Sequence, residues 1–392
     1  MDIIEKNKSR IFELSVNQQK LRVQVESLDW EELATALDEC IFKKNQNSIP
    51  SEYGPASYLP STPSTIEQEE LYAQAYQHGE ELIRSGKIAA FTVAGGQGTR
   101  LGYDGPKGTL PVSPIKNKPL FQLFAEQIRG VSEKYETMIP WYIMCSPLNL
   151  EATISHFEEN SYYGLAKENI KFFAQGVMPA TDFDGNLLLA SEDSLALSPN
   201  GHGGSLKALI DSGSIKDMAD REVQHVSYFQ VDNPLVCTIN PLFIGLHDLQ
   251  KSDMSSRSLT KTGPFEKLGN FVSIGDRISI IEYSDLPEEK ALEKDEAGQI
   301  KYRAGSPAIH VLRRDFIEQF ASGEIKLPYH RAEKKVVHLN DNGVLVIPEK
   351  PNAVKFETFV FDALPFAKNP LILEADRGEE FSPVKNMTGV DS

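Results

Sequence analysis

An apolar segment runs into a glycine-rich loop in the stretch Phe91-Thr-Val-Ala-Gly-Gly-Gln-Gly-Thr-Arg-Leu-Gly-Tyr-Asp-Gly-Pro-Lys-Gly108. The apolar part, which starts at Ile88, predicts a buried strand. The glycines that follow tolerate positive φ and carry no side chain, so successive backbone N–H groups can turn toward one point and bind phosphate oxygens. Arg100 and Lys107 add full positive charges to the same loop. The stretch therefore predicts a phosphate-binding loop at the end of a strand.

This loop differs from the two commonest phosphate-binding motifs. A Walker loop needs Gly-x-x-x-x-Gly-Lys-Ser/Thr, and the sequence contains no such run. The dinucleotide fingerprint Gly-x-Gly-x-x-Gly also fails, because Gly96, Gly98 and Gly102 are one residue too widely spaced at the end. The run Ala-Gly-Gly-x-Gly-Thr-Arg-Leu-Gly, followed by Pro-Lys-Gly, resembles instead the nucleotide loop of the sugar-1-phosphate nucleotidyltransferases. The alternative interpretation is a tight turn with solvated basic residues.

Short apolar segments alternate with amphipathic helices from about residue 86 onward. The expected strands are Ile88–Ala94, Pro140–Ser146, Ile170–Gln175 and His225–Val231, and the expected helices between them are Leu120–Lys134, Asn149–Glu159 and Ser205–Ser212. This alternation is typical of an α/β fold whose mostly parallel sheet is covered by helices on both faces. We therefore predict one domain over residues 86–392.

Residues 1–85 predict a helical flank with no chemistry of its own. Glu13–Leu37 is rich in Leu, Val, Glu and Gln at helix-compatible spacing, and Thr65–Ser85 is a second helical segment. Ser27 is the expected N-cap of a helix with acidic residues in its first turn.

Composition excludes several classes of function. The chain has 392 residues and a net charge of −16, which argues against a nucleic-acid groove, because such a groove needs a broad basic surface. The three cysteines form no Cys-x-x-Cys pair, so they indicate neither a zinc site nor a disulfide framework and favour a reducing, cytoplasmic location. The first residues have no apolar core typical of a signal peptide, and no apolar run is long enough to cross a membrane.

Several polar residues directly follow predicted strands. Because ligands bind at the carboxyl ends of parallel strands, Gly95, Ser146, Gln175 and Asp232 are expected to face one cleft. Asp232 is a natural Mg²⁺ ligand there, since magnesium prefers few carboxylates and completes its shell with phosphate oxygens and water. The alternative for Asp232 is an Asx turn or a helix cap.

Further candidates lie later in the chain. A second glycine loop, Ser198-Pro-Asn-Gly-His-Gly-Gly-Ser205, precedes a helix, and His202 in it could contact a base, a ribose or a sugar hydroxyl. The alternative is a plain loop with a helix cap. Apolar residues from Phe356 to Leu364 have helical spacing, which places Lys355 near the start of a helix. By composition alone, Lys355 and Lys385 are surface lysines.

The segments from about residue 88 onward together resemble the UDP-sugar pyrophosphorylases, a family of UTP:sugar-1-phosphate uridylyltransferases that includes the UDP-N-acetylglucosamine and UDP-glucose pyrophosphorylases. The resemblance implies a Rossmann-like, GT-A-like mixed sheet flanked by helices. It also implies nucleotide contacts at Ala94, Gly95, Gly96, Lys107, Gln175 and Gly201, with Asp232 at the metal and the α-phosphate.

The same resemblance assigns the sugar side of the site. Glu282 and Tyr283, in Ile-Ile-Glu-Tyr-Ser-Asp-Leu-Pro, match the motif that meets the sugar. Lys355 matches a lysine that touches the nucleotide phosphates, and Lys385 matches one that touches the sugar phosphate. Larger members continue into a C-terminal β-rich domain, which is expected to be either absent or cut off in this sequence.

Two departures from the acetylglucosamine enzymes leave the sugar open. Those enzymes carry Gly-Asn-Gly where this chain has Gly201-His202-Gly203, the form that resembles glucose and broad-specificity members. The sugar-facing run Ala-Gly-Asn of those enzymes is replaced here by Ala-Gly-Ser, which ends at Ser306.

The expected reaction joins UTP and a sugar 1-phosphate, with Mg²⁺ as cofactor and pyrophosphate as the leaving group. The attacking phosphate is already anionic, so no enzyme nucleophile is needed and catalysis consists of positioning and charge neutralisation. Arg100, Lys107, Lys355 and Lys385 are the expected cations. A catalytically silent nucleotide-sugar binding or regulatory protein is the alternative, because fold alone does not determine function.

Overall fold

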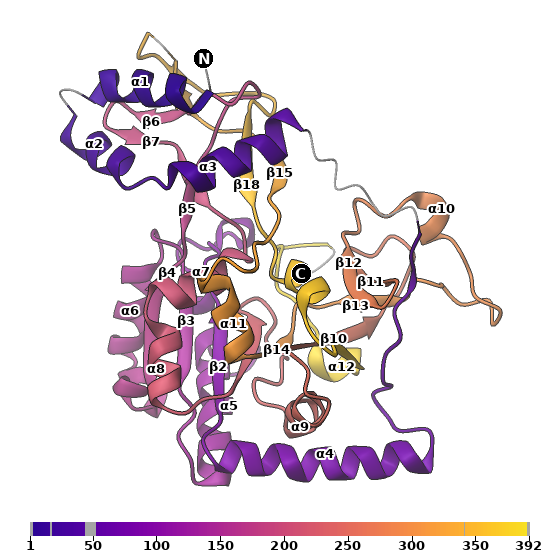
Figure 1. Ribbon diagram of the computed structural model, residues 1–392. Coiled ribbons are helices and arrows are strands. Elements are labelled where there is room, and N and C mark those ends of the chain that lie inside the picture. The colour runs from indigo at the N-terminus through magenta and orange to yellow at the C-terminus, as the bar shows by residue number, and fades with distance from the viewer. Residues whose placement is uncertain (1–2, 16–17, 44–51, 341, 390–392) are drawn as a thin grey trace. The chain divides into compact units, whose positions relative to one another are not determined.

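The computed structural model describes residues 3–15, 18–43, 52–340 and 342–389 (Figure 1). The described residues form two compact units, each assembled from segments that are far apart in the sequence. The first unit is drawn from Met1–Ser48, Gly176–Gly204 and Leu327–Val360, and the second from Ile49–Gln175, Ser205–Lys326 and Phe361–Ser392. These units follow three-dimensional packing and do not coincide with the division of the sequence at residues 85 and 86, which stays a prediction.

The first unit combines the N-terminal helices with short strands from the middle and the end of the chain. Its elements are α1 (Ile3–Ser15), α2 (Gln19–Glu26), α3 (Trp30–Leu37), the π-helical turn η1 (Asp38–Phe42), β5 (Val177–Pro179), β6 (Leu189–Ser191), β7 (Ser194–Leu195), β8 (Leu197–Pro199), β15 (His330–Lys334), β16 (His338–Leu339), β17 (Leu345–Val346) and β18 (Ala353–Glu357). The helices bury apolar residues such as Leu33 and Leu37 against Leu187, Val354 and Phe356 of the strand segments. Burial of this surface is the main force that holds the three segments together.

The second unit contains a mixed, 11-stranded sheet. Its strands are β1 (Gly54–Pro55), β2 (Ile88–Val93), β3 (Trp141–Cys145), β4 (Ile170–Ala174), β9 (His225–Gln230), β10 (Met254–Thr260), β11 (Gly269–Ile274), β12 (Arg277–Ile281), β13 (Ala304–Ser306), β14 (His310–Arg313) and β19 (Leu371–Glu374). The order is β1-β11-β13-β10-β14-β9-β2-β3-β4, with β12 beside β11 and β19 beside β10. Strands β9, β2, β3 and β4 are parallel, as the sequence predicts, whereas β14 joins β9 in antiparallel register.

Helices and short turns connect these strands. They are α4 (Ile66–Arg84), η2 (Thr99–Leu101), η3 (Lys107–Thr109), α5 (Leu120–Tyr135), α6 (Leu150–Glu159), η4 (Ser161–Gly164), η5 (Lys167–Asn169), α7 (Gly204–Asp211), α8 (Ser214–Asp220), α9 (Pro241–Leu249), α10 (Glu288–Ala291), α11 (Arg314–Ala321), η6 (Val360–Phe366) and α12 (Arg377–Glu380). In the part of the chain that the structure describes, none of the helices combines the length and the apolar character that crossing a bilayer requires.

Successive side chains of a strand point to opposite faces of the sheet, so both faces of the parallel strands offer side chains against which helices pack. Trp141 and Ile143 of β3 belong to an apolar cluster with Phe121 of α5 and Phe157 of α6. Tyr142, between them in the sequence, instead donates a hydrogen bond to Asp217 of α8 at 2.6 Å. The expected α/β class, with helices flanking a mixed sheet, is therefore confirmed.

Local expectations are met unevenly. Helix α4 matches the predicted Thr65–Ser85, and its N-cap Thr65 accepts a hydrogen bond from the backbone of Gln68. The predicted helical character of Glu13–Leu37 is confirmed for the described residues, in which α2 ends at Glu26 and α3 begins at Trp30. The N-cap of α3 is Asp29 and not Ser27, because the Asp29 carboxylate accepts from the backbone N–H groups of Glu31 and Glu32.

Lys355 does not lie near the start of a helix. It is the middle residue of β18 and pairs with Ala332 of β15. Burial alternates from Val354 to Glu357, which is the period of a strand, and the helical turn η6 begins only at Val360. The residues with helical spacing thus belong to two different elements, β18 and η6. Pairing with β15, some twenty residues earlier, makes the first of them a strand.

Candidate functional site

The glycine loop after β2 is held by an amide side chain from the neighbouring strand-to-helix connection. Asn149, which is fully buried, donates to the backbone oxygens of Gly95 and Gly96 at 3.0 and 3.1 Å. The backbone N–H of Lys107 also donates to the oxygen of Gly96 at 3.0 Å, which brings the end of the loop back to its start. The loop is therefore fixed by two connections, and its remaining N–H groups keep defined directions.

Two of the loop's neighbours come from the ends of β3 and β4. A Cβ atom on Gly95 would lie 2.4 Å from Oε1 of Gln175 and 3.4 Å from the backbone nitrogen of Ser146, so a larger residue at position 95 would displace the Gln175 side chain. The Oγ atom of Ser146 is buried and has no hydrogen-bond partner among the described residues. The structure thus brings Gly95, Ser146 and Gln175 together at the carboxyl ends of the parallel strands.

Three cations and one carboxylate gather beside this loop. The Nζ atom of Lys107 lies 4.0 Å from the Asp232 carboxylate, and Lys107 is only 8% exposed. Burial lowers the pKa of Lys107, Asp232 opposes that change, and the charges of Arg100 and Lys385 lower the pKa further. Arg100 and Lys385 are thus each close enough to Lys107 to repel its charge, an arrangement that favours a polyanionic ligand in a chain whose net charge is −16.

The residues expected to meet the sugar gather at the antiparallel part of the same sheet. Gly269 of β11 pairs with Ser306 of β13. A Cβ atom on Gly269 would lie 3.6 Å from Oε1 of Glu282, the residue that follows β12. Tyr283 comes next and is 44% exposed. Ser306, Glu282 and Tyr283 therefore belong to one region of the second unit.

The remaining candidates belong to the first unit. Gly201 has φ +82°, and a Cβ atom there would lie 2.4 Å from the backbone oxygen of Thr358, so position 201 requires glycine. The ring of His202 stacks on Phe359 at 5.2 Å between centroids, and His330 lies against the same phenyl ring at 4.3 Å. Lys355 lies on β18 of this unit.

His202 is held as a neutral ring. Its Nδ1 atom accepts a hydrogen bond from the backbone N–H of Val360 at 3.2 Å, which an imidazolium could not do. Burial and then the nearby His330 lower the pKa of His202 to about 4. Near neutral pH this side chain therefore offers hydrogen bonding and ring stacking, and no charge.

Sequence reasoning missed the clamping role of Asn149. The sequence places Asn149 only at the start of a helix, because an Asn ahead of an apolar run is a common N-cap. In the structure its side chain makes no cap hydrogen bond and turns to the glycine loop instead. The Ser-Pro-Leu-Asn run itself carries no signal for that choice, which depends on the loop some fifty residues earlier.

Known proteins resemble this chain over most of its length. A family model described as UTP–glucose-1-phosphate uridylyltransferase matches residues 42–390. A Schizosaccharomyces pombe protein named "Probable UDP-N-acetylglucosamine pyrophosphorylase" is 35% identical over 386 residues, which are 94% of this chain and 79% of that protein. The Xenopus tropicalis UDP-N-acetylhexosamine pyrophosphorylase-like protein 1 is 38% identical over 322 residues, 80% of this chain and 63% of that one.

A solved structure shares the fold. The uridine diphosphate N-acetylglucosamine pyrophosphorylase from Trypanosoma brucei, in complex with an inhibitor, superposes with a TM-score of 0.79 at 24% identity. The match covers 100% of this chain and 82% of that structure. At this identity the likeness concerns the fold alone.

Proposed function

Because this chain belongs to the UTP–glucose-1-phosphate uridylyltransferase family, we propose that it transfers the uridylyl group of UTP to a sugar 1-phosphate and releases pyrophosphate. The observation that carries the proposal is the cluster at the clamped glycine loop, in which Arg100, Lys385 and the Asp232 carboxylate all lie near Lys107. Positive charges that lie close together repel one another and do not stabilise the folded chain. A triphosphate and a phosphate acceptor bound beside them would neutralise this charge.

In this reaction an oxygen of the sugar phosphate attacks the α-phosphorus of UTP, and the bond from that phosphorus to the pyrophosphate oxygen breaks. We assign Arg100 and Lys107 to the negative charge that develops on the pyrophosphate, and Lys385 to the attacking phosphate. The backbone of the loop at Ala94, Gly95 and Gly96 orients the nucleotide, and Gln175 beside Gly95 reads the uracil edge. The roles expected for Gly201, His202 and Lys355 rest on the family resemblance and stay predictions.

The donor set fits one magnesium ion. Asp232 lies just after β9 with a side chain that is 14% exposed, so its carboxylate is reachable from the site. Among the described residues, no three His, Cys, Asp or Glu side chains are grouped so that they could hold a metal by themselves. A single carboxylate beside a phosphate site is the usual protein contribution to bound Mg²⁺, which would supply charge neutralisation at the α-phosphate.

Two sugar 1-phosphates are candidates for the acceptor. N-acetylglucosamine 1-phosphate is the first candidate, because the relatives that match most of this chain carry that sugar or N-acetylhexosamine in their names. Glucose 1-phosphate is the second, because His202 and Ser306 stand where acetylglucosamine enzymes are expected to carry Asn.

A panel assay tests the function and the sugar together. The protein is incubated with UTP, Mg²⁺ and, separately, the 1-phosphates of N-acetylglucosamine, glucose and galactose, and pyrophosphate release is followed. We expect turnover with at least one of the first two sugars. Nucleotide binding without release of pyrophosphate from UTP in the presence of any of these sugar phosphates would favour the silent binding protein instead.

A further inference from the structure

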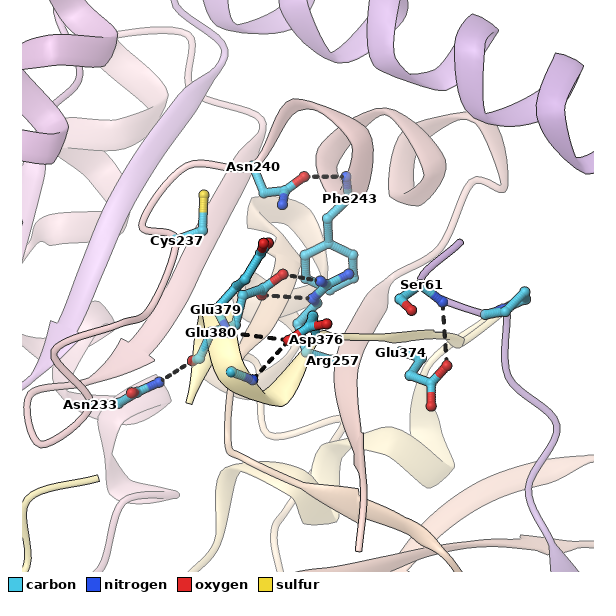
Figure 2. A network of polar contacts seen from close by, with 12 residues as sticks. Ser61, Asn233, Cys237, Asn240, Phe243, Arg257, Glu374, Asp376, Glu379 and Glu380 are labelled. Carbon is cyan, nitrogen blue, oxygen red and sulfur yellow. Dashed lines mark hydrogen bonds and ion pairs between the residues drawn. The ribbon is translucent and has the colours of Figure 1, made fainter. Parts of the chain in front are cut away.

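The chain segment that carries Lys385 is held on the second unit by a cluster of polar contacts (Figure 2). The segment follows β19 and opens with α12, whose N-cap Asp376 accepts from the backbone N–H groups of Gly378 and Glu379 at 2.8 and 3.2 Å. None of these residues belongs to the expected active site. Their contacts nevertheless determine where the following residues run.

An ion pair between a buried arginine and a partly buried glutamate anchors the end of α12. Arg257 of β10 is 5% exposed, and its Nε atom donates to Oε2 of Glu380 at 3.1 Å while its Nη2 atom contacts Oε1. The guanidinium also lies 5.4 Å from the ring centre of Phe243 on α9. A two-point contact of this kind fixes direction as well as distance, and it tolerates loss of one partner poorly.

A second set of contacts ties the same segment to the end of β9. The side-chain amide of Asn233 donates to the backbone oxygen of Glu380 at 2.7 Å and accepts from the backbone N–H of Ser382 at 3.0 Å. The N–H of Val384 then donates to the backbone oxygen of Asp232 at 2.8 Å. Residues 232 and 233 thus hold three backbone groups of the segment just before Lys385.

The far end of the segment reaches the glycine loop. A Cβ atom on Gly102 would lie 2.4 Å from the Cε atom of Met387, so the two stretches are in direct contact. Lys385 lies between the part of the segment tied to Asn233 and the part that touches Gly102. Contacts before and after Lys385 in the sequence therefore hold its side chain near the loop.

We propose that Asn233 and the Arg257–Glu380 pair are positioning residues, which hold the C-terminal segment so that Lys385 reaches the phosphate site beside Lys107 and Asp232. The role assigned to Lys385 rests on the proposed uridylyltransferase activity. The positioning itself is a property of the chain and is measurable without turnover.

The kinetic test compares two asparagine variants. Asn233→Ala removes both contacts to the segment, whereas Asn240→Ala removes the N-cap of α9 and touches no residue of the segment in the described contacts. Both variants lose some stability, so stability does not separate them. We expect Asn233→Ala to lower kcat/KM for the sugar 1-phosphate by about 10- to 100-fold, because small misplacements of a reacting group have effects of that size, and Asn240→Ala to change it less than threefold.

A double-variant cycle separates positioning from general damage. If Asn233 acts through Lys385, Asn233→Ala has little further effect in a Lys385→Ala background. Glu380→Gln, which leaves Arg257 beside a neutral partner, is expected to behave in the same way. Equal losses in both backgrounds would overturn the proposal and leave the uridylyltransferase function standing.

Hydrogen exchange gives a readout that does not depend on activity. In Asn233→Ala the amides of residues 384–387, which Asn233 does not contact directly, should exchange at least tenfold faster, while Asn240→Ala leaves them unchanged. Unchanged exchange in Asn233→Ala overturns the positioning. If the wild-type protein turns over no sugar phosphate, the proposed function fails and this exchange measurement still decides whether the contacts hold the segment.

Discussion

Lys107 shows how a single residue combines a structural cost with a proposed catalytic use. Its ammonium group is almost fully buried, lies near two other cations and has one carboxylate at 4.0 Å. Burial and like charge both disfavour its protonated form, so without a ligand the residue destabilises the fold. An unfavourable free energy of this kind is typical of functional sites, where the bound ligand supplies the interaction that the charged group lacks.

The substitution Lys107→Met should therefore separate activity from stability. We expect turnover to fall by about 10²–10³-fold, the usual effect of removing one charge-stabilising group, because the charge on pyrophosphate loses a partner. Without nucleotide, the melting temperature should stay the same or rise. Lys116→Met, at an exposed position, is the control and should change neither quantity. Near-normal turnover of Lys107→Met would remove this residue from the mechanism.

His202 predicts a particular pH dependence of stability. Its pKa is about 4 in the folded chain and 6.5 in an ordinary histidine, so the unfolded chain binds one more proton between these values. Stability should therefore fall as pH drops from 6.5 to 4, with no further loss from this group below pH 4. We expect His202→Asn, measured by thermal unfolding, to lose less stability over this range than the wild-type protein. Identical pH profiles would contradict the neutral state of His202.

At the scale of elements, helices α4 and α9 approach each other closely at a glycine on each helix. A Cβ atom on Gly245 of α9 would lie 1.7 Å from the backbone oxygen of Ala75, and one on Gly79 of α4 would lie 1.9 Å from that of Pro241. Both obstacles are backbone atoms, which cannot move without displacing a helix. The predicted helix Thr65–Ser85 is thus correct as an element, but the sequence gives no indication of the partner that its glycine faces.

Gly245→Ala should destabilise the second unit by about 1–3 kcal/mol, since extra volume in a close-packed contact forces the backbone apart. Gly130→Ala on α5 is the matched control, because a Cβ atom there has no neighbour within 4 Å. That change should be neutral or stabilise the protein by about 0.5–1 kcal/mol, the intrinsic preference of helices for alanine. Urea unfolding measures both. Equal stability of the two variants would contradict the close approach of α4 and α9.

For the molecule as a whole, the net charge is negative, whereas the charge at the proposed phosphate site is positive. The chain carries −16, yet Arg100, Lys107 and Lys385 meet at one loop. Long-range electrostatics therefore repel a triphosphate, and affinity must come from short-range contacts and from a divalent ion that lowers the charge of the nucleotide. Ligand binding to the folded state then stabilises the entire chain by mass action.

UTP with Mg²⁺ should raise the melting temperature more than UTP with EDTA. At a nucleotide concentration about 100-fold above Kd the stabilisation should be about 2.7 kcal/mol. In Asp232→Asn we expect the magnesium-dependent part of the increase to disappear, because the amide is a poorer ligand for a hard cation, while the part seen in EDTA remains. A full magnesium effect in Asp232→Asn would contradict the assignment of the metal ligand.

The sequence by itself determined the family, the α/β class and the strand-to-glycine loop at Ile88–Gly98, because these depend on local chemistry: apolar runs, glycine's freedom at positive φ and the spacing of charged residues. Tertiary structure alone decided that Asn149 clamps the loop, that Lys355 lies on a strand, and that Asn233 holds Glu380. The last contact joins residues 147 positions apart. Local pattern carries no information about such pairs, since they form only after separate segments are brought together by burial of apolar surface.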